Sequence, residues 1–141
     1  MVRRKLRDRV VLDTSVLISS LWGGASQQVV HRWKHGLIQP IVSDEIVEEY
    51  LRVLARFDLS RRALRGWALW LTHPSKVTVV NPARHFAASR DQTDNKFLDA
   101  ATAGNAALII TRDKDLLALK RHRRARILTP EEALNELGST S

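Results

Sequence analysis

The chain has 141 residues and a mass of 16.0 kDa, which corresponds to one domain of ordinary size. Its 44% apolar and 27% charged residues exclude a wholly disordered or fibrous protein, and the lack of cysteine excludes disulfide frameworks and thiolate metal sites. The formal charge of +8 and the pI of about 10.8 favour polyanionic partners, nucleic acid first and an anionic membrane surface second.

The N-terminal region is strongly basic, with five lysines or arginines among its first nine residues. We predict a basic arm over residues 1–9 that adds nonspecific affinity for RNA, followed by one domain over residues 10–138. The apolar run after the arm resembles a secretory signal, but Asp13 interrupts it. We therefore expect a cytoplasmic protein that does not associate with membranes.

Five short and continuously apolar runs predict buried strands, and helical patterns separate them. The strands are expected over residues 9–12, 38–42, 77–80, 108–111 and 126–128. The helices are expected over residues 14–21, 26–35, 44–56, 60–71, 93–104, 116–120 and 130–137. This alternation predicts an α/β fold, a three-layer sandwich in which helices cover both faces of a parallel sheet.

Three side chains are expected to cap helices at their N-termini. Ser26 and Ser43 precede helical patterns, and a serine can accept a hydrogen bond from a free N–H group at a helix start. Thr129 is followed by Pro130 and, three residues on, by Glu132, which predicts a capping box.

Carboxylates occur where such a sheet binds its ligands, beyond the carboxyl ends of the strands. Asp13 and Asp113 follow the first and fourth predicted strands, Asp94 opens the helix before the fourth, and Glu49 lies on the helix after the second. Each also has a structural interpretation. Asp13 and Asp94 can cap helices, Asp113 can stabilise a turn, and Glu49 can belong to a solvated helix face.

Four carboxylates in one crevice repel one another unless protons or a cation neutralise them. Oxygen ligands without cysteine suit hard ions, so we expect Mg²⁺ or Mn²⁺. His31 and His35 are four residues apart but lack the intervening glutamate of a zinc protease motif, and they are expected to be surface residues. An acidic metal site on a basic chain favours cleavage of phosphodiesters.

Four segments, in this order, resemble the PIN-domain family, and most closely its VapC-like toxin branch. They are VLDTSVL (11–17), SDEIVEEYLRVL (43–54), DQTDNKFLDAA (91–101) and IITRDKDLL (109–117). The likeness extends from about Val10 to Leu128. It implies a five-stranded parallel sheet of order 3-2-1-4-5 and an endoribonuclease that depends on Mg²⁺ or Mn²⁺.

The resemblance also implies roles for particular residues and partners. The family's acidic quartet corresponds to Asp13, Glu49, Asp94 and Asp113, and Asp99 matches an additional acid that some members carry. Ser15 and Thr111 match its supporting polar positions. The implied role is the toxin of a type II toxin–antitoxin pair, with RNA as substrate, a cognate antitoxin as partner and a homodimer as the assembly.

Basic and aromatic residues add two further expectations. A basic group follows Asp113 and is expected to form either a phosphate-binding rim beside the metal site or a solvated loop: Arg112, Lys114, Arg121, Arg123 and Arg124. Trp67 and Trp70 share one helix face, which indicates either core packing or a dimer or antitoxin contact. Two other functions stay open, a nucleic-acid-binding regulator with a non-catalytic acidic cluster and a metal-dependent phosphohydrolase.

Overall fold

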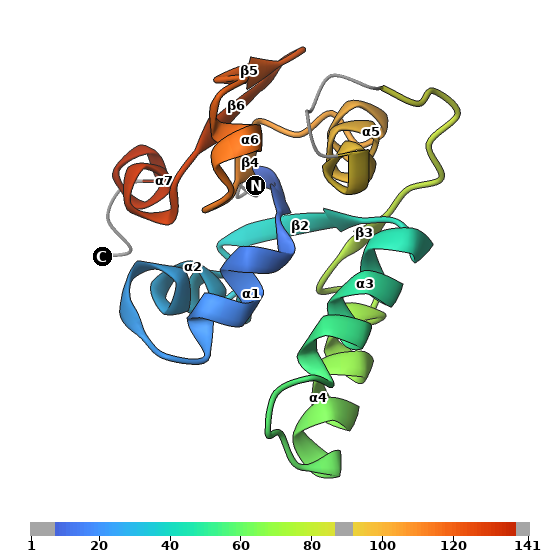
Figure 1. Ribbon diagram of the computed structural model, residues 1–141, viewed down its shortest axis with the longest axis vertical. Helices are drawn as coiled ribbons and strands as arrows, with labels where there is room; N and C mark the ends of the chain where they lie inside the picture. The colour runs from blue at the N-terminus through green and yellow to red at the C-terminus, as the bar shows by residue number, and fades with distance from the viewer. Residues whose placement is uncertain (1–7, 87–91, 138–141) are drawn as a thin grey trace, which may run out of the picture.

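The computed structural model describes residues 8–86 and 92–137 (Figure 1). Its strands are β1 (Asp8–Leu12), β2 (Ile38–Val42), β3 (Thr78–Val79), β4 (Leu108–Ile110), β5 (Arg121–His122) and β6 (Ala125–Leu128). Its helices are α1 (Thr14–Ser20), α2 (Gly24–Lys34), α3 (Asp44–Leu54), α4 (Arg61–Leu71), α5 (Asn95–Ala103), α6 (Lys114–Leu117) and α7 (Pro130–Leu137), and a 3₁₀ turn at Gln92–Asp94 leads into α5. The predicted arm lies outside the described residues except for Asp8 and Arg9, which belong to β1.

The sheet has the order β3-β2-β1-β4-β6-β5. The neighbouring pairs β3–β2, β2–β1, β1–β4 and β4–β6 are parallel, whereas β5 and β6 are antiparallel. The α/β class and the order of the five predicted strands are therefore confirmed, and β5 is an additional edge strand. β1 lies inside the sheet, and its last three residues are apolar and buried, as is typical of a parallel strand covered by helices on both faces.

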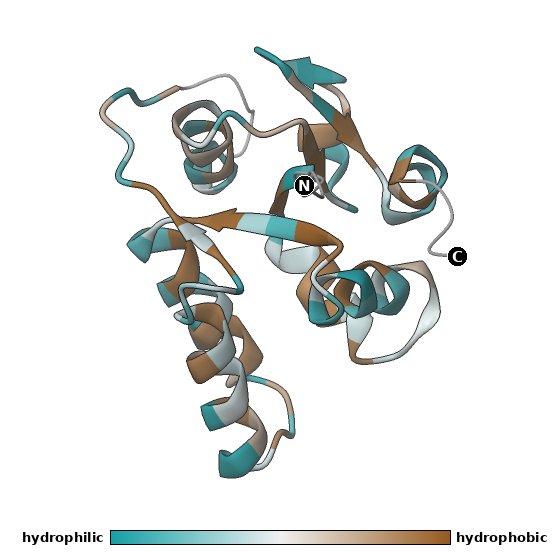
Figure 2. Ribbon diagram, turned by 180° about the vertical axis from the view of Figure 1, so that it is seen from behind, coloured by the Kyte–Doolittle hydropathy of each residue, from teal (hydrophilic) through white to brown (hydrophobic). Residues whose placement is uncertain are grey.

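Helices cover both faces of this sheet (Figure 1). On one face α1 and α2 pack together, and α7 packs against α2. On the other face α5 contacts β1, β2 and β4. The helices α3 and α4 run side by side and project away from the strands, as Figures 1 and 2 show. This arrangement agrees with right-handed crossovers in opposite directions from the central strand.

Close packing of α5 against β2 depends on Gly104, which ends α5. A Cβ atom at this position would lie 2.7 Å from two side-chain carbons of Ile41, a fully buried residue of β2. Glycine therefore lets the end of α5 approach the sheet closely. The close approach helps to set the position of the whole helix, including its first residues.

Helix starts lie within two residues of the predicted ones and helix ends within three. The Ser43 cap and the Thr129–Glu132 capping box are confirmed by their hydrogen bonds. The Ser26 cap is wrong, because α2 begins at Gly24 and Ser26 is buried inside it, where its Oγ lies 2.5 Å from Ser19 Oγ. The helix predicted over 116–120 is α6, which begins two residues earlier because Asp113 caps it.

The short strand β5 was not predicted because its two residues are polar and carry no apolar signal. Figure 2 shows it as hydrophilic beside the apolar β6. None of the helices in residues 8–86 and 92–137 is both long and apolar enough to cross a membrane.

Candidate metal centre

Asp13 directly follows β1 at the carboxyl edge of the sheet, the edge where the parallel strands end. Its N–H group donates to the carbonyl oxygen of Ile110 at 2.9 Å, so sheet pairing continues one residue past β1. Asp13 Oδ2 accepts hydrogen bonds from Ser15 Oγ at 2.6 Å and Thr111 Oγ1 at 2.8 Å. Its side chain does not cap α1, and two hydroxyl groups therefore orient this buried carboxylate.

Asp113 follows β4, the strand that pairs with β1. Its Oδ1 accepts a hydrogen bond from the N–H of Asp115 at 2.8 Å and so caps α6. The Thr111 hydroxyl accepts from the N–H of Asp113 at 2.9 Å while it donates to Asp13. A single hydroxyl group thus links the segments that carry the first and the last predicted acid.

Three carboxylates come together at this edge. Asp94 is buried at the end of the 3₁₀ turn before α5. One carboxylate oxygen from each of Asp94, Asp113 and Asp115 lies within 4.8 Å of the other two. Carboxylates this close repel one another when ionised, and a cation bound among them removes that repulsion.

Asp115 is the member of this group that sequence reasoning missed. It lies two residues after Asp113, which caps α6, and it belongs to the first turn of that helix. A correct prediction that α6 begins at Lys114 would have indicated Asp115, because that start places Asp113 and Asp115 at the same end of the helix.

Glu49 lies near this group but is engaged elsewhere. Its Oε1 accepts from Lys96 Nζ at 2.7 Å, and its Oε2 accepts from the Thr14 hydroxyl. Two other glutamates of α3, Glu45 and Glu48, are exposed, so Glu49 is the one that faces α1 and α5. Hydrogen bonds occupy both oxygens of Glu49, and its predicted role as a metal ligand stays a prediction.

Asp99 points to a different part of the molecule. Its Oδ1 accepts from the N–H of Phe86 at 2.7 Å, and its Oδ2 lies 3.0 Å from His85 Nδ1. On a helix, Asp94 and Asp99 diverge by about 140° around the axis. Asp99 therefore holds the segment after β3 against α5 instead of joining the three clustered carboxylates.

Burial raises the pKa of Asp13, and the neighbouring charges of Asp113 and Glu49 raise it further. The hydrogen bonds from Ser15 and Thr111 act in the opposite direction because they stabilise the ionised form. Burial likewise raises the pKa of Tyr50 well above its ordinary value, and its hydroxyl donates to the carbonyl of Leu12. The carboxyl edge is therefore a region of concentrated negative charge with little solvent to screen it.

The donor set fits a hard divalent cation. Asp94, Asp113 and Asp115 offer carboxylate oxygens from two segments of backbone, the type of ligand that hard ions take. Asp13 and Thr111 fix the position of Asp113 from the central strand. These residues can hold a metal ion at the carboxyl edge, where α/β sheets of this kind bind ligands.

Two of the five predicted basic residues also lie at this edge. Lys114 is exposed at the first position of α6. Arg112 forms a bidentate pair with Glu131 of α7, at 3.2 and 3.1 Å, and its Nε donates to Ser26 Oγ at 3.1 Å. Arg112 thus ties α7 and α2 to the loop that carries Asp113.

The other three, Arg121, Arg123 and Arg124, belong to the β5–β6 hairpin at the amino edge, the edge where the parallel strands begin. The register shows this directly, because Arg126 at the start of β6 pairs with Leu108 at the start of β4. The rim expected beside the carboxylates is therefore not formed by these arginines. The segment directly before a parallel strand lies at the opposite end from the segment that follows one.

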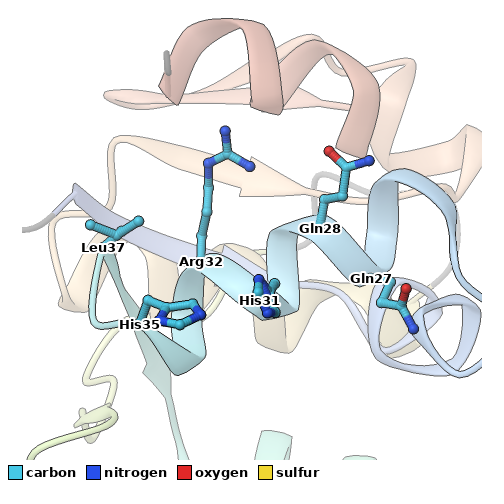
Figure 3. Close-up of a pocket in the computed structure, with 6 residues that line it drawn as sticks. All are labelled: Gln27, Gln28, His31, Arg32, His35 and Leu37. Atoms are coloured by element: carbon cyan, nitrogen blue, oxygen red, sulfur yellow. The ribbon is translucent and has the colours of Figure 1, made fainter. Parts of the chain in front are cut away.

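His31 lies on α2 and His35 follows the last residue of that helix, and Figure 3 shows both side chains. His31 and His35 are exposed, and their ring centroids are 4.5 Å apart. They line a cavity of about 710 Å³, and its described lining residues include no carboxylate. Two neighbouring imidazoles without further ligands do not complete a zinc site, which agrees with the surface role expected from the sequence.

The tryptophans of α4 take part in the packing of this chain. Trp70 stacks on the buried Trp33 of α2 with a centroid distance of 3.8 Å, and Trp67 lies 6.4 Å from the same ring. Both remain partly exposed. Internal packing thus accounts for one side of each ring, and the dimer or antitoxin contact stays a prediction.

Two comparisons with known proteins bear on this site. A family model described as PIN domain matches residues 9–115, a range that contains all of the clustered acids. A protein of Methanocaldococcus jannaschii named as uncharacterized is 26% identical over 152 aligned positions, which cover 94% of this chain and 93% of that protein. The similarity to that protein thus extends over nearly the full length of both chains.

Proposed function

The chain belongs to the PIN domain family, and on that basis we propose that it is an endoribonuclease that hydrolyses RNA phosphodiester bonds with Mg²⁺ or Mn²⁺. PIN domains are typically metal-dependent nucleases. The observation that carries the proposal is the group of Asp94, Asp113 and Asp115, whose carboxylate oxygens lie within 4.8 Å of one another. Oxygen ligands of this type favour Mg²⁺ or Mn²⁺ over softer ions.

In the proposed site, Asp94, Asp113 and Asp115 hold the ion. Asp13 and the Thr111 hydroxyl keep Asp113 in place, and Lys96 neutralises Glu49 beside them. A bound divalent ion supplies Lewis acidity to phosphoryl oxygens and lowers the pKa of a water molecule. The proposed hydrolysis forms a bond between a water oxygen and phosphorus and breaks the bond from phosphorus to the 3′ oxygen, which leaves as a hydroxyl.

RNA is proposed as the substrate on two grounds. The net charge of +8 favours a polyanion, and the four family-like segments are most similar to the toxin branch. On the same resemblance we propose that the protein is the toxin of a type II toxin–antitoxin pair, that it forms a homodimer and that a separate antitoxin chain inhibits it.

The nuclease proposal is tested with labelled single-stranded RNA and purified protein. We expect cleavage in Mg²⁺ or Mn²⁺, no cleavage in EDTA, and products with 5′-phosphate and 3′-hydroxyl ends. Binding of RNA without cleavage in either metal would favour the regulator. Hydrolysis of nucleoside monophosphates without cleavage of RNA would favour the phosphohydrolase.

A separate experiment tests the toxin role. Expression of the wild-type chain should arrest growth, whereas expression of Asp94→Asn should not. Co-expression of a small neighbouring reading frame that encodes the antitoxin should restore growth. Light scattering of the purified chain tests the dimer, and a monomer would refute the proposed assembly without affecting the nuclease proposal.

A further inference from the structure

A small cavity of about 210 Å³ opens at the amino edge of the sheet, far along α5 from the clustered carboxylates. It is bounded by the end of α5, the β5–β6 hairpin and the segment after β3. Its lining includes three arginines, Arg84, Arg123 and Arg124, together with Thr102, Asn105 and His122. Since α5 has nine residues, the cavity lies about 13 Å along the helix from Asp94.

The guanidinium groups are held around one aromatic ring. The Cζ atoms of Arg84 and Arg123 each lie 5.1 Å from the centroid of Phe86. Arg124 Nη1 donates to Asn105 Oδ1 at 3.2 Å. The ring and the amide position the arginine heads, and neither neutralises their charge.

Acidic partners are missing from this arginine group within the described part of the chain. Among residues 8–86 and 92–137, Arg84, Arg123 and Arg124 have no carboxylate oxygen within 4.0 Å. Burial lowers the pKa of His122 in the same cavity and the charge of Arg123 lowers it further, while the charge of Asp99 acts in the opposite direction. The three arginines that line the cavity thus outnumber the one carboxylate whose charge acts on His122, in contrast to the clustered acids at the carboxyl edge.

The backbone around this cavity has a conformation that side chains disfavour. The three described non-glycine residues with positive φ are Asn105 (57°), Lys120 (62°) and Arg123 (54°). Two of them line the cavity, and Lys120 directly precedes the hairpin. A two-residue hairpin loop with positive φ at its first position favours glycine, yet arginine occupies it here. Strained positions of this kind cluster at binding sites.

From this arrangement we propose that Arg84, Arg123 and Arg124 form a phosphate-binding site that holds the backbone of the RNA strand several nucleotides away from the bond that is cut. The inference rests on the proposed function for the identity of the strand. Arginine recognises phosphate through several donors in a fixed plane, and the cavity accommodates a group of that size. The strand would thus be held at both edges of the sheet, with α5 between them.

The test measures binding of a fluorescent single-stranded RNA by anisotropy in EDTA, where cleavage does not interfere. The triple variant Arg84→Gln, Arg123→Gln, Arg124→Gln should bind about tenfold or more weakly, since charged hydrogen bonds to phosphate are lost. The slope of log K against log salt should fall by at least about 0.7, the value for one phosphate contact on a single strand.

The matched control is the triple variant Arg61→Gln, Arg62→Gln, Arg65→Gln, which removes the same charge from the exposed side of α4. It should keep the salt slope of the wild type. Equal losses of RNA affinity in both triple variants would mean that net charge alone drives binding, and this result would refute the proposed phosphate-binding site. Circular dichroism establishes that both variants are folded.

Two further measurements separate the sources of phosphate and the two proposals. His122 ring resonances should shift on addition of the RNA, and inorganic phosphate at equal concentration should shift them less. A larger shift with inorganic phosphate would overturn the assignment to RNA. Cleavage by the wild type together with unchanged binding by the cavity variant refutes only this site. Selective loss of binding without any wild-type cleavage refutes only the nuclease.

Discussion

At the carboxyl edge of the sheet buried and half-buried carboxylates lie close together beside a few basic residues, whereas at the amino edge three arginines lie around a hairpin turn. Asp13 comes directly after β1, and Asp113 comes three residues after the end of β4. The arginines Arg123 and Arg124 come directly before β6. The acidic group and the arginine group thus lie at opposite edges of one sheet, separated by the length of its strands.

The difference between the edges follows from parallel pairing. All strands except β5 run in the same direction. Residues that follow these strands therefore lie at one edge of the sheet, and residues that precede them lie at the other. At the carboxyl edge, the hydroxyl groups of Ser15 and Thr111 hold the Asp13 side chain in place. At the amino edge, the Phe86 ring and the turn at Arg123, where φ is positive, position the arginine side chains.

The largest expected effect is on catalysis at the carboxyl edge. Asp94→Asn should lower kcat/KM for RNA by about a hundredfold or more, because it removes a ligand whose metal contributes several kcal/mol to the transition state. Asp115→Asn should change kcat/KM in the same direction. The measurement is cleavage of labelled RNA in Mn²⁺, with circular dichroism as the folding check.

Asp99→Asn is the matched control, because Asp99 is buried on the same helix but bonds to His85 and Phe86. We expect it to lower the rate less than about tenfold, through the position of the loop. Cleavage at the wild-type rate by folded Asp94→Asn would refute the assignment of the site, whatever the family.

The second prediction concerns the stability of the same edge. Without metal at pH 7, Asp13→Asn should raise the free energy of unfolding by about 1–2 kcal/mol, since it removes a buried charge that its neighbours repel. The pKa of Asp13 is raised above 3.8 in the fold, so the cost of ionisation is absent below that pH and grows as the pH rises through the folded pKa.

Urea unfolding from pH 4 to 7.5 measures this difference. The gain of Asp13→Asn over the wild type should shrink toward pH 4. A gain that is constant over this range would contradict the electrostatic cause. Addition of Mn²⁺ should stabilise the wild type more than Asp94→Asn.

Much of the carboxyl edge was predictable from sequence. Asp13 is the first polar residue after one apolar run and Asp113 is the third residue after another, and the order of the two strands places both at one edge. Asp115 was not predictable from its type alone, because its role depends on where α6 begins. The engagement of Glu49 by Lys96 requires two helices to be in contact, and periodicity along one helix does not contain that information.

The amino edge was predicted less well for a different reason. The arginines after Asp113 are close to it in sequence, and the predicted rim beside the metal site, the alternative to a solvated loop, depends on that closeness. A parallel strand at 126–128 already requires the segment before it to lie at the far edge. Strand β5 has two polar residues, and the antiparallel pairing that forms it depends on the turn at Arg123.

The third prediction compares two adjacent residues of that turn. Arg123→Gly should raise the free energy of unfolding by about 0.5–1 kcal/mol, because φ is positive there and a side chain costs more than glycine. Arg124→Gly should lower the free energy of unfolding, because Arg124 is outside the positive φ region and loses its bond to Asn105. Urea unfolding of both variants measures the contrast, and a loss of stability in Arg123→Gly would contradict the strain.

The smallest expected effect is a pH dependence opposite in sign to that of Asp13. His122 is buried at the amino edge, and its Nε2 lies 3.0 Å from the Thr102 hydroxyl. Burial and the charge of Arg123 hold its pKa below the ordinary value of 6.5, and the charge of Asp99 acts in the opposite direction. The unfolded chain therefore takes up a proton before the folded chain does. The contribution of neutral His122 is complete above pH 6.5 and is lost as the pH falls through the folded pKa.

His122→Gln isolates this contribution, because glutamine can keep a hydrogen bond to Thr102 but does not titrate. Between pH 7.5 and pH 5, the wild type should lose up to about 1 kcal/mol of stability relative to the variant. As the pH falls toward 4, protonation of Asp13 should stabilise the wild type relative to Asp13→Asn. Acidification would thus strengthen the carboxyl edge and weaken the amino edge of one sheet. The same sign in both comparisons would show that the two edges do not differ in electrostatic environment as the structure indicates.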